Sequence, residues 1–223
     1  MIRIPKTDEL FDIGHSIAKD MLEKCEYPHS ALPLIEQCII KIIPTLDRSY
    51  REISDGVFVA KDAKVWDGAT ITGPTIIGHN AEIRPGAFIR GRVIIGDGAV
   101  IGNSTEIKNS IVFDEVQLPH YNYVGDSIIG YRAHMGAGSI ASNLRLDKKE
   151  IILSCEGDTM KTGLRKVGAF IGDYAEVGCG CVLCPGAVIG RESVIYPLVC
   201  ANGYIPERSI FDGNTIKNKI IGE

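Results

Sequence analysis

A six-residue spacing of apolar side chains runs through the middle of this 223-residue chain. Every sixth residue is aliphatic or aromatic at Val59, Val65, Ile71, Ile77, Ile83, Ile89, Ile95, Ile101, Ile107 and Phe113. The spacing resumes at Ile129 and again at Ile171. A period of six matches neither the helical period of 3.6 nor the simple alternation of a half-buried strand. The spacing therefore predicts a repeat architecture.

Small residues fill the positions between these apolar side chains. Gly78, Gly96 and Gly102 each follow an apolar position directly, and Ala, Thr or Val mostly stands four residues after one. Hexapeptide repeats build β-helices, in which each hexad makes a short strand and a corner. A β-sandwich would place its turns about 8–12 residues apart. We therefore predict a mainly β fold, a left-handed parallel β-helix of hexapeptide repeats over residues 51–206.

The first fifty residues lack the six-residue spacing and predict a short N-terminal helical segment, residues 1–50, with two helices. The first begins near Thr7, which can cap it. The second runs from about Ala31 to Ile43 and is ended by Pro44. We expect both helices to pack on the first coil and cover its open edge, with a subunit contact as the alternative. Residues 207–223 are expected to form a C-terminal tail.

Charge and hydropathy exclude two classes of partner. A net charge of −4 and a pI near 5.8 argue against a nucleic-acid surface, which needs clustered positive charge. No apolar run approaches the roughly 18 residues of a membrane span. The first residues, MIRIPKTDELFDIG, lack the apolar core of a signal peptide. We therefore expect a cytoplasmic protein.

The repeat is interrupted twice, and function in a solenoid usually lies on such insertions. The first interruption, residues 119–128, is predicted to be a loop that leaves the coils. It carries His120, whose side-chain type suits proton transfer near neutral pH. The second, residues 143–166, contains EIILSC followed by EGD. These motifs predict a strand and a turn, and so a projecting hairpin.

Several motifs in order resemble a known family. The run IRPGAFIRGRVIIGDGAVIGNSTEIKNSIVFDEVQLPHYNYVGDSIIG resembles the C-terminal acetyltransferase domain of N-acetylglucosamine-1-phosphate uridyltransferases. MGAGSIASNLRLD and GLRKVGAFIGD are similar to the archaeal-type sugar-1-phosphate nucleotidyltransferases that also acetylate amino sugars. Both belong to the hexapeptide-repeat acyltransferases, and the similarity covers roughly residues 56–206. It implies acetyl transfer from acetyl-CoA to the amine of an amino-sugar phosphate or nucleotide sugar, in a homotrimer with active sites between subunits.

The resemblance also implies roles for particular residues. His120 takes the place of the catalytic base. Its implied substrate-binding residues are Arg84, Lys108, Tyr123, Asn143, Lys149 and Lys166. Ala137 and Cys179 match the small residues along which coenzyme A lies. The tetrahedral oxyanion would take a backbone N–H near residues 135–141 as its donor.

Cysteines and histidines also raise the possibility of a metal site. Without an export signal, the seven cysteines are interpreted as reduced thiols. Cys181 falls at a small interior position of its hexad, so the Cys179–Cys184 stretch is interpreted as apolar filling. Hexapeptide-repeat zinc carbonic anhydrases need two histidines about five residues apart, a spacing absent here. We predict that no metal is required.

This chain departs from the family at several positions. His134 and Leu144 replace an asparagine and a tyrosine of the family's acceptor site, and the C-terminal basic contact to coenzyme A has no clear counterpart. Two helices stand where the bifunctional relatives carry a nucleotidyltransferase domain, so we expect no pyrophosphorylase activity. These departures leave two alternatives open: a non-catalytic trimeric scaffold or regulator, and an acetyltransferase for a different acceptor.

Overall fold

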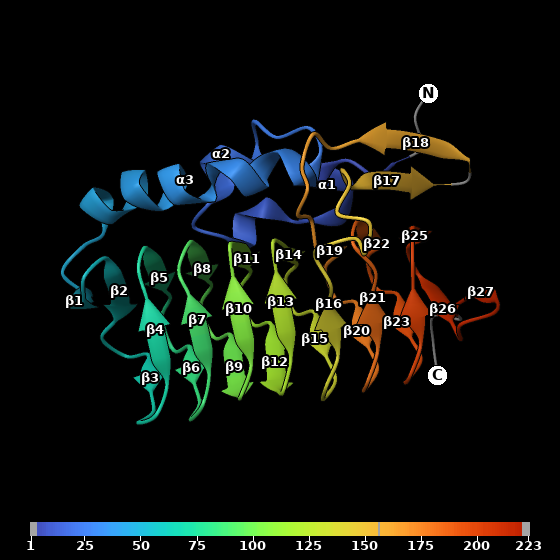
Figure 1. The fold of residues 1–223 in the computed structure, drawn as a ribbon. Helices are drawn as coiled ribbons and strands as arrows, with labels where there is room; N and C mark the ends of the chain where they lie inside the picture. Colours follow the sequence, from blue (N-terminus) through green and yellow to red (C-terminus); the bar gives the residue numbers. More distant parts are fainter. Residues whose placement is uncertain (1–3, 156, 220–223) are drawn as a thin grey trace.

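A computed structural model describes residues 4–155 and 157–219, and it confirms the mainly β fold as a left-handed parallel β-helix. Figure 1 shows the coils stacked side by side as a prism with three sheets, here named sheets I, II and III in the order in which the chain enters them. The corner that joins sheet II to sheet III is the II–III corner, and the one that leads back to sheet I is the III–I corner.

The three sheets run the length of the prism. Sheet I contains β1 (Tyr50–Ser54), β2 (Val57–Ala60), β5 (Thr75–Ile77), β8 (Val93–Ile95), β11 (Ser110–Val112), β14 (Ile128–Ile129), β19 (Ala169–Ile171), β22 (Ala187–Ile189) and β25 (Tyr204–Ile205). Sheet II contains β3 (Lys64–Val65), β6 (Glu82–Ile83), β9 (Val100–Asn103), β12 (Gln117–His120), β15 (His134–Met135), β20 (Glu176–Val177), β23 (Val194–Ile195), β26 (Ser209–Phe211) and β27 (Ile216–Asn218). Sheet III contains β4 (Thr70–Thr72), β7 (Phe88–Arg90), β10 (Glu106–Lys108), β13 (Tyr123–Gly125), β16 (Ile140–Ala141), β21 (Val182–Leu183) and β24 (Cys200–Ala201).

The interior ladder follows the predicted hexads as far as Ile107 and then slips by one residue. In sheet I, Ile77 pairs with Ile95, but Ile95 pairs with Val112 rather than with Phe113. The turn between β10 and β11 is one residue shorter than the turns before it. The slip moves Phe113 off the predicted interior ladder, and its ring instead lies 5.4 Å from the ring of Phe11 in the N-terminal segment.

The predicted loop at residues 119–128 does not leave the solenoid, and this prediction is wrong. His120 ends β12 and pairs with Asn103 of the preceding coil, and Tyr123 opens β13 opposite Glu106. The six-residue spacing breaks here because the III–I corners before β11 and β14 are each one residue shorter, while the backbone hydrogen bonds continue from coil to coil. His120 is therefore held by the scaffold itself.

The helical segment is more broken than expected and lies elsewhere. It consists of α1 (Thr7–Leu10), η1 (Ile13–His15), α2 (Lys19–Leu22), η2 (Pro28–Leu34), α3 (Ile35–Ile42) and η3 (Ile43–Thr45). The first predicted helix breaks because the Asp12 carboxylate accepts the Gly14 N–H and the Ser16 hydroxyl accepts the Ala18 N–H. Both bonds favour turns over a continuous helix.

This segment lies across the outer face of sheet I rather than on the first coil (Figure 1). Leu10 and His15 accept backbone hydrogen bonds from Asp173 and Asp114 of the later coils, and α3 packs on β8. Sheet I is accordingly buried on both faces, and its outer ladder includes Ile76, Ile94, Ile111, Ile128, Phe170 and Val188. The first coil is covered instead by β1, which pairs antiparallel with β2.

The second insertion forms the predicted hairpin, with β17 (Ile152–Cys155) antiparallel to β18 (Asp158–Lys161). It does not simply project: Ile151, Leu153 and Cys155 are buried. A Cβ on Gly186, whose φ is +82°, would meet Ile151 at 2.8 Å and Leu153 at 3.1 Å. Only glycine therefore lets the hairpin lie this close to the coil.

The expected C-terminal tail, residues 207–223, is partly wrong, since β26 continues sheet II and β27 turns back beside it. Residues 220–223 of the expected tail lie outside the described part of the chain. No helix within the described ranges is long and apolar enough to cross a membrane.

A half-buried carboxyl group joins the helical segment to the solenoid. Asp114 accepts the Asp97 N–H at 2.8 Å, and its carboxylate lies 3.9 Å from His15, whose ring stacks on Tyr131. Burial, the largest cause, raises the pKa of Asp114 to about 6, and the backbone bond opposes the shift. An acid with a raised pKa stabilises the fold only while it is protonated, and that contribution is lost as the pH rises from about 4 to about 6.

Asp114→Asn is therefore expected to increase the free energy of unfolding at pH 7.5 by about 1–2 kcal/mol, with no gain at pH 4. The amide oxygen can still accept the Asp97 N–H, while the cost of burying a charge disappears. The measurement is urea unfolding of both proteins at each pH, at one protein concentration. A variant that is no more stable than the wild type at pH 7.5 would contradict the stated cost of ionising Asp114.

Candidate functional site

The II–III corner brings three of the predicted residues together in successive coils. The Gly138 N–H donates to the His120 carbonyl at 3.0 Å, and the Gly180 N–H donates to the Ala137 carbonyl at 2.8 Å. These bonds align His120, Ala137 and Cys179 along one edge of the prism, which we call the His120 column. The His120 side chain is exposed, and no hydrogen bond to it is found among the described residues.

Asn122, a residue that sequence reasoning missed, fixes the backbone of this column. It is 2% exposed. Its side-chain oxygen accepts the His120 N–H at 3.2 Å, and its amide donates to the Gly136 carbonyl at 2.8 Å and to the Ser139 hydroxyl at 3.0 Å. Its signal was its place inside HYNYVGD, where it could be taken for a turn residue. Asn122 therefore joins two coils directly behind His120.

A second group of predicted residues gathers at the III–I corner around Asp126, which was not assigned a role from sequence. The Asp126 carboxylate lies 3.2 Å from the Lys108 ammonium and accepts hydrogen bonds from the amides of Asn109 and Asn143. The side chains of Lys108 and Asp126 are 12% and 8% exposed, so this is a buried ion pair. We call Lys108, Asn109, Asp126 and Asn143 the Asp126 cluster.

Tyr123 reaches this cluster from the outer face of sheet III. Its hydroxyl lies close to the Asn143 amide beside Gly125. Burial, the largest cause, raises the pKa of Tyr123, while the Asn143 amide opposes the rise. A Cβ on Gly125 would lie 2.6 Å from the Tyr123 hydroxyl, so glycine allows the ring to lie along the strand. Tyr123 is therefore protonated at neutral pH and can donate a hydrogen bond to a ligand.

Lys166 lies near this cluster, whereas Arg84 and Lys149 do not. Lys166 lines a cavity of about 230 Å³ that Asp126 and Asn109 also line. Arg84 is on the outer side of sheet II, where Glu82 holds its guanidinium at 3.0 Å. Lys149 is exposed on the second insertion, where its N–H donates to Asp147. The structure thus forms two groups and leaves Arg84 and Lys149 apart from both.

The two residues that depart from the family's acceptor site, His134 and Leu144, differ in their surroundings. His134 pairs with Glu176 at 2.9 Å, and Leu144 is 38% exposed. Cys181 is fully buried, as expected of an apolar filler, whereas Cys184 and Cys200 face each other with their sulfur atoms 3.6 Å apart. No group of three or more His, Cys, Asp or Glu side chains suited to a metal ion occurs in residues 4–155 and 157–219.

Comparison with known proteins gives three kinds of match. The model of the GMPPB C-terminal domain matches residues 71–156. A bifunctional sugar-1-phosphate nucleotidylyltransferase/acetyltransferase of Sulfurisphaera tokodaii is 40% identical over 101 residues, 45% of this chain and 25% of the relative. The uncharacterized acetyltransferase YaiX of Escherichia coli is 32% identical over 155 residues, 70% of this chain and 67% of that protein.

A solved hexapeptide transferase family protein from Anaplasma phagocytophilum shares 20% identity with a TM-score of 0.39, over 70% of this chain and 74% of that one. This chain spans about a quarter of the length of the bifunctional relative, which is the longer of the two curated proteins compared.

Proposed function

Because this chain belongs to the hexapeptide-repeat acetyltransferases, we propose that it moves an acetyl group from acetyl-CoA to the amine of an amino-sugar phosphate or nucleotide sugar. The observation that carries the proposal is the His120 column. It places an exposed imidazole with no side-chain partner among the described residues beside two small residues of the following coils. The bifunctional relative of S. tokodaii carries both sugar-1-phosphate nucleotidylyltransferase and acetyltransferase in its name, which supports a phosphorylated sugar as acceptor.

The reaction needs a proton acceptor and a surface that holds acetyl-CoA with its thioester beside that acceptor. The acceptor nitrogen attacks the thioester carbon as its proton passes to His120, directly or through one water. The tetrahedral intermediate then expels the coenzyme A thiolate, which takes the proton from His120, and no acyl-enzyme forms. Coenzyme A would lie along the small residues Ala137 and Cys179. No metal takes part in this sequence of steps.

The Asp126 cluster would hold the acceptor. Tyr123 and Asn143 offer hydrogen bonds to a phosphate or a sugar hydroxyl from the face of sheet III. Since Asp126 orients both Lys108 and Asn143, the cluster is rigid before the acceptor binds, and preorganisation of this kind reduces the entropic cost of positioning.

A homotrimer with its sites between subunits remains part of the proposal. The outer face of sheet III carries partly exposed apolar side chains, among them Phe88, Ile140 and Val182. A neighbouring copy that packs there would cover these residues and enclose the surface along which acetyl-CoA is proposed to lie. Size-exclusion chromatography with light scattering gives the oligomeric state directly.

A non-catalytic trimeric scaffold or regulator is the second candidate. It is favoured by the neutralisation of two cations that the resemblance assigns to phosphate binding, Arg84 by Glu82 and Lys108 by Asp126. An acetyltransferase for another acceptor is a third, because His134 and Leu144 alter the acceptor side.

The test is release of the coenzyme A thiol from acetyl-CoA with a panel of amino-sugar 1-phosphates, nucleotide amino sugars and other amines, together with calorimetric binding of coenzyme A. Turnover with a phosphorylated amino sugar is expected. Coenzyme A binding with turnover only on unphosphorylated amines would favour the third candidate. If there is neither turnover nor coenzyme A binding, the non-catalytic scaffold or regulator is the candidate that remains.

A further inference from the structure

We propose that the cavity at the III–I corner binds the nucleotide-side phosphate of a nucleotide sugar's diphosphate, with Arg92 and Lys166 as its cationic contacts. The cavity of about 230 Å³ lies between the helical segment and the corner of the solenoid. Leu32 and Glu36 of the helical segment form one wall, and Arg92, Asn109, Asp126 and Lys166 form the other. This inference rests on the proposed function, and it selects among the acceptors that the function allows.

One arginine and one lysine outside the cavity lining could bind a phosphate, but each is already paired with a carboxylate. Arg84 is paired with Glu82, and Lys108 is paired with Asp126. Arg92 and Lys166, in contrast, are exposed and make no ion pair and no side-chain hydrogen bond within the described ranges. Charge-assisted hydrogen bonds from cations without competing carboxylates are the stronger contacts for a phosphate. Of these four cations, the two without a carboxylate partner are therefore the ones that line the cavity.

The corner positions these groups at regular intervals. Arg92 precedes β8, and its carbonyl accepts the Ser110 N–H that follows Asn109. Asp126 lies on the next coil, with its carbonyl accepting the Gly168 N–H. Coils are separated by about 4.8 Å, and Arg92 and Lys166 belong to coils three steps apart. Both residues line the same cavity, so their long side chains approach it from different coils and can bind one anion together.

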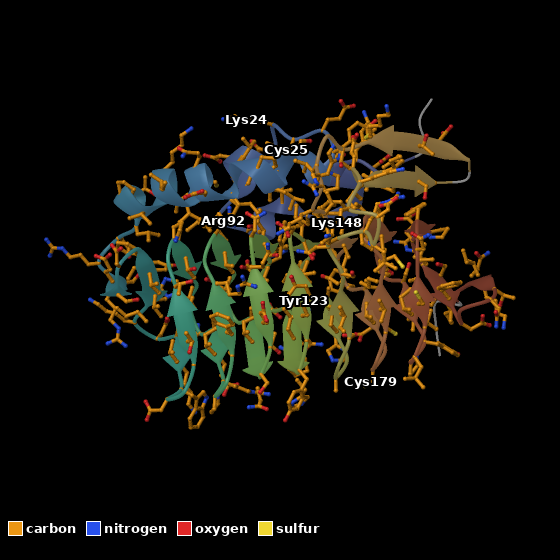
Figure 2. The ribbon with its side chains drawn as sticks, viewed as in Figure 1. Lys24, Cys25, Arg92, Tyr123, Lys148 and Cys179 are labelled. Atoms are coloured by element: carbon orange, nitrogen blue, oxygen red, sulfur yellow. The ribbon has the colours of Figure 1, made fainter. Side chains whose placement is uncertain are left out.

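The charge balance of the cavity also fits an anion. Asp126 is offset by Lys108, which leaves Arg92 and Lys166 against the single carboxylate of Glu36 on the opposite wall. Figure 2 shows Arg92 at the edge of the solenoid beneath the helical segment. Tyr123 lies lower in the same view, on β13, and Cys179 lies at the far edge of the prism. The phosphate site and the His120 column thus flank sheet III.

That separation determines the acceptor class. A ligand that reaches from His120 to the cavity must cross β13, three residues or about 10 Å. A 2-amino sugar 1-phosphate carries its amine and its phosphate ester oxygen on neighbouring ring carbons, so its nitrogen and phosphate are too close together to span this distance. In a nucleotide sugar the phosphate nearer the sugar can lie at Tyr123 and Asn143, and the second can enter the cavity. The structure therefore favours a nucleotide-linked amino sugar as the acetyl acceptor.

Binding of inorganic diphosphate and of UDP, measured by titration calorimetry at constant ionic strength, tests the site without any need for turnover. The wild type is expected to bind both probes at least about tenfold more tightly than inorganic phosphate. Arg92→Gln and Lys166→Gln should each weaken diphosphate binding about tenfold or more. Glu36→Gln should strengthen it, because it removes the opposing carboxylate from the other wall.

Arg51→Gln is the matched control, since Arg51 is exposed on β1 and has no ion pair among the described residues. It changes the net charge by the same amount and should leave binding unchanged. Diphosphate binding that is absent in the wild type, or equal in Arg92→Gln and the wild type, would overturn the inference. Thermal unfolding of each variant separates lost binding from lost structure.

Enzyme kinetics distinguish a failure of the proposed phosphate site from a failure of the proposed acetyl transfer, on which the site assignment rests. If the wild type acetylates an acceptor, Arg92→Gln should raise the KM of a nucleotide amino sugar and leave that of the sugar 1-phosphate unchanged. If the wild type binds diphosphate in an Arg92-dependent way but transfers no acetyl group to any acceptor, the site stands and the proposed activity fails. If Arg92→Gln turns over efficiently with an unchanged KM for the nucleotide amino sugar, the proposed activity stands and the proposed phosphate site is rejected.

Discussion

Replacing His120 with asparagine is expected to lower kcat for acetyl transfer by about 10²–10⁴-fold, with a much smaller change in KM. The size of the effect is that of removing a positioned general base from a reaction whose nucleophile must lose a proton. Asparagine keeps a polar side chain of similar size on the same backbone, which Asn122 holds through the residue 120 N–H. The variant should therefore fold normally and bind coenzyme A with unchanged affinity.

His79→Asn supplies the matched control for this experiment. His79 lies between β5 and β6, two coils before His120, and pairs with Asp62 at 3.0 Å. Its replacement removes a histidine from another corner of the prism without touching the His120 column, so kcat should stay within about threefold of the wild type. A His120→Asn variant with full kcat would remove His120 from the mechanism, whatever the activity of the wild type.

The solenoid could be predicted because its signal is local and repeated. Each apolar residue from Val59 to Ile107 marks one strand, and the inward direction follows from the period alone. The slip at Phe113 was hidden, because Val112 and Phe113 are both apolar and the shorter corner after Lys108 leaves no mark in composition. The same shortening produced the apparent loop at residues 119–128, although the backbone ladder continues through it.

The position of the helical segment could not be predicted because its partners are far away in sequence. The Leu10 carbonyl accepts from Asp173, and the Asp12 N–H donates to the same residue's carboxylate. Local pattern shows that Ile35 and Ile39 form an apolar face, but not which sheet that face covers. The all-apolar strands VII, AFI and AVI of sheet I were the overlooked signal, since a strand buried on both faces needs a second covering layer.

The candidate site was predictable in its residue types but not in its pairings. The resemblance named Lys108 and Asn143 for their contacts with a substrate, whereas the structure shows both bound to Asp126. Such pairings join residues on neighbouring coils, and the period of the apolar residues gives no sign of which polar side chains meet across coils. The same limit hid Arg92, which becomes a candidate only when Lys166 and the helical wall are seen around one cavity.

Asp126→Asn is expected to lower the free energy of unfolding by about 3–5 kcal/mol, because it leaves the Lys108 ammonium buried without its counter-ion. The pair is little exposed on either side, and its oxygen atoms also take the amide hydrogens of Asn109 and Asn143. The neutral amide can accept only part of these bonds. The midpoint and slope of urea unfolding, at fixed protein concentration, measure the loss.

Two further variants decide whether the unpaired charge is the cause. Asp147→Asn breaks an ion pair with Arg145 whose side chains are about 40% exposed, and it should cost far less stability than Asp126→Asn because exposed pairs contribute little. Lys108→Met combined with Asp126→Asn removes both charges and should recover most of the stability lost by Asp126→Asn alone, because a buried pair can often be replaced by neutral side chains at little cost. If the double variant is as unstable as Asp126→Asn, the loss comes from the broken amide bonds to Asn109 and Asn143. The cluster would then hold its shape mainly through hydrogen bonding rather than through its ion pair.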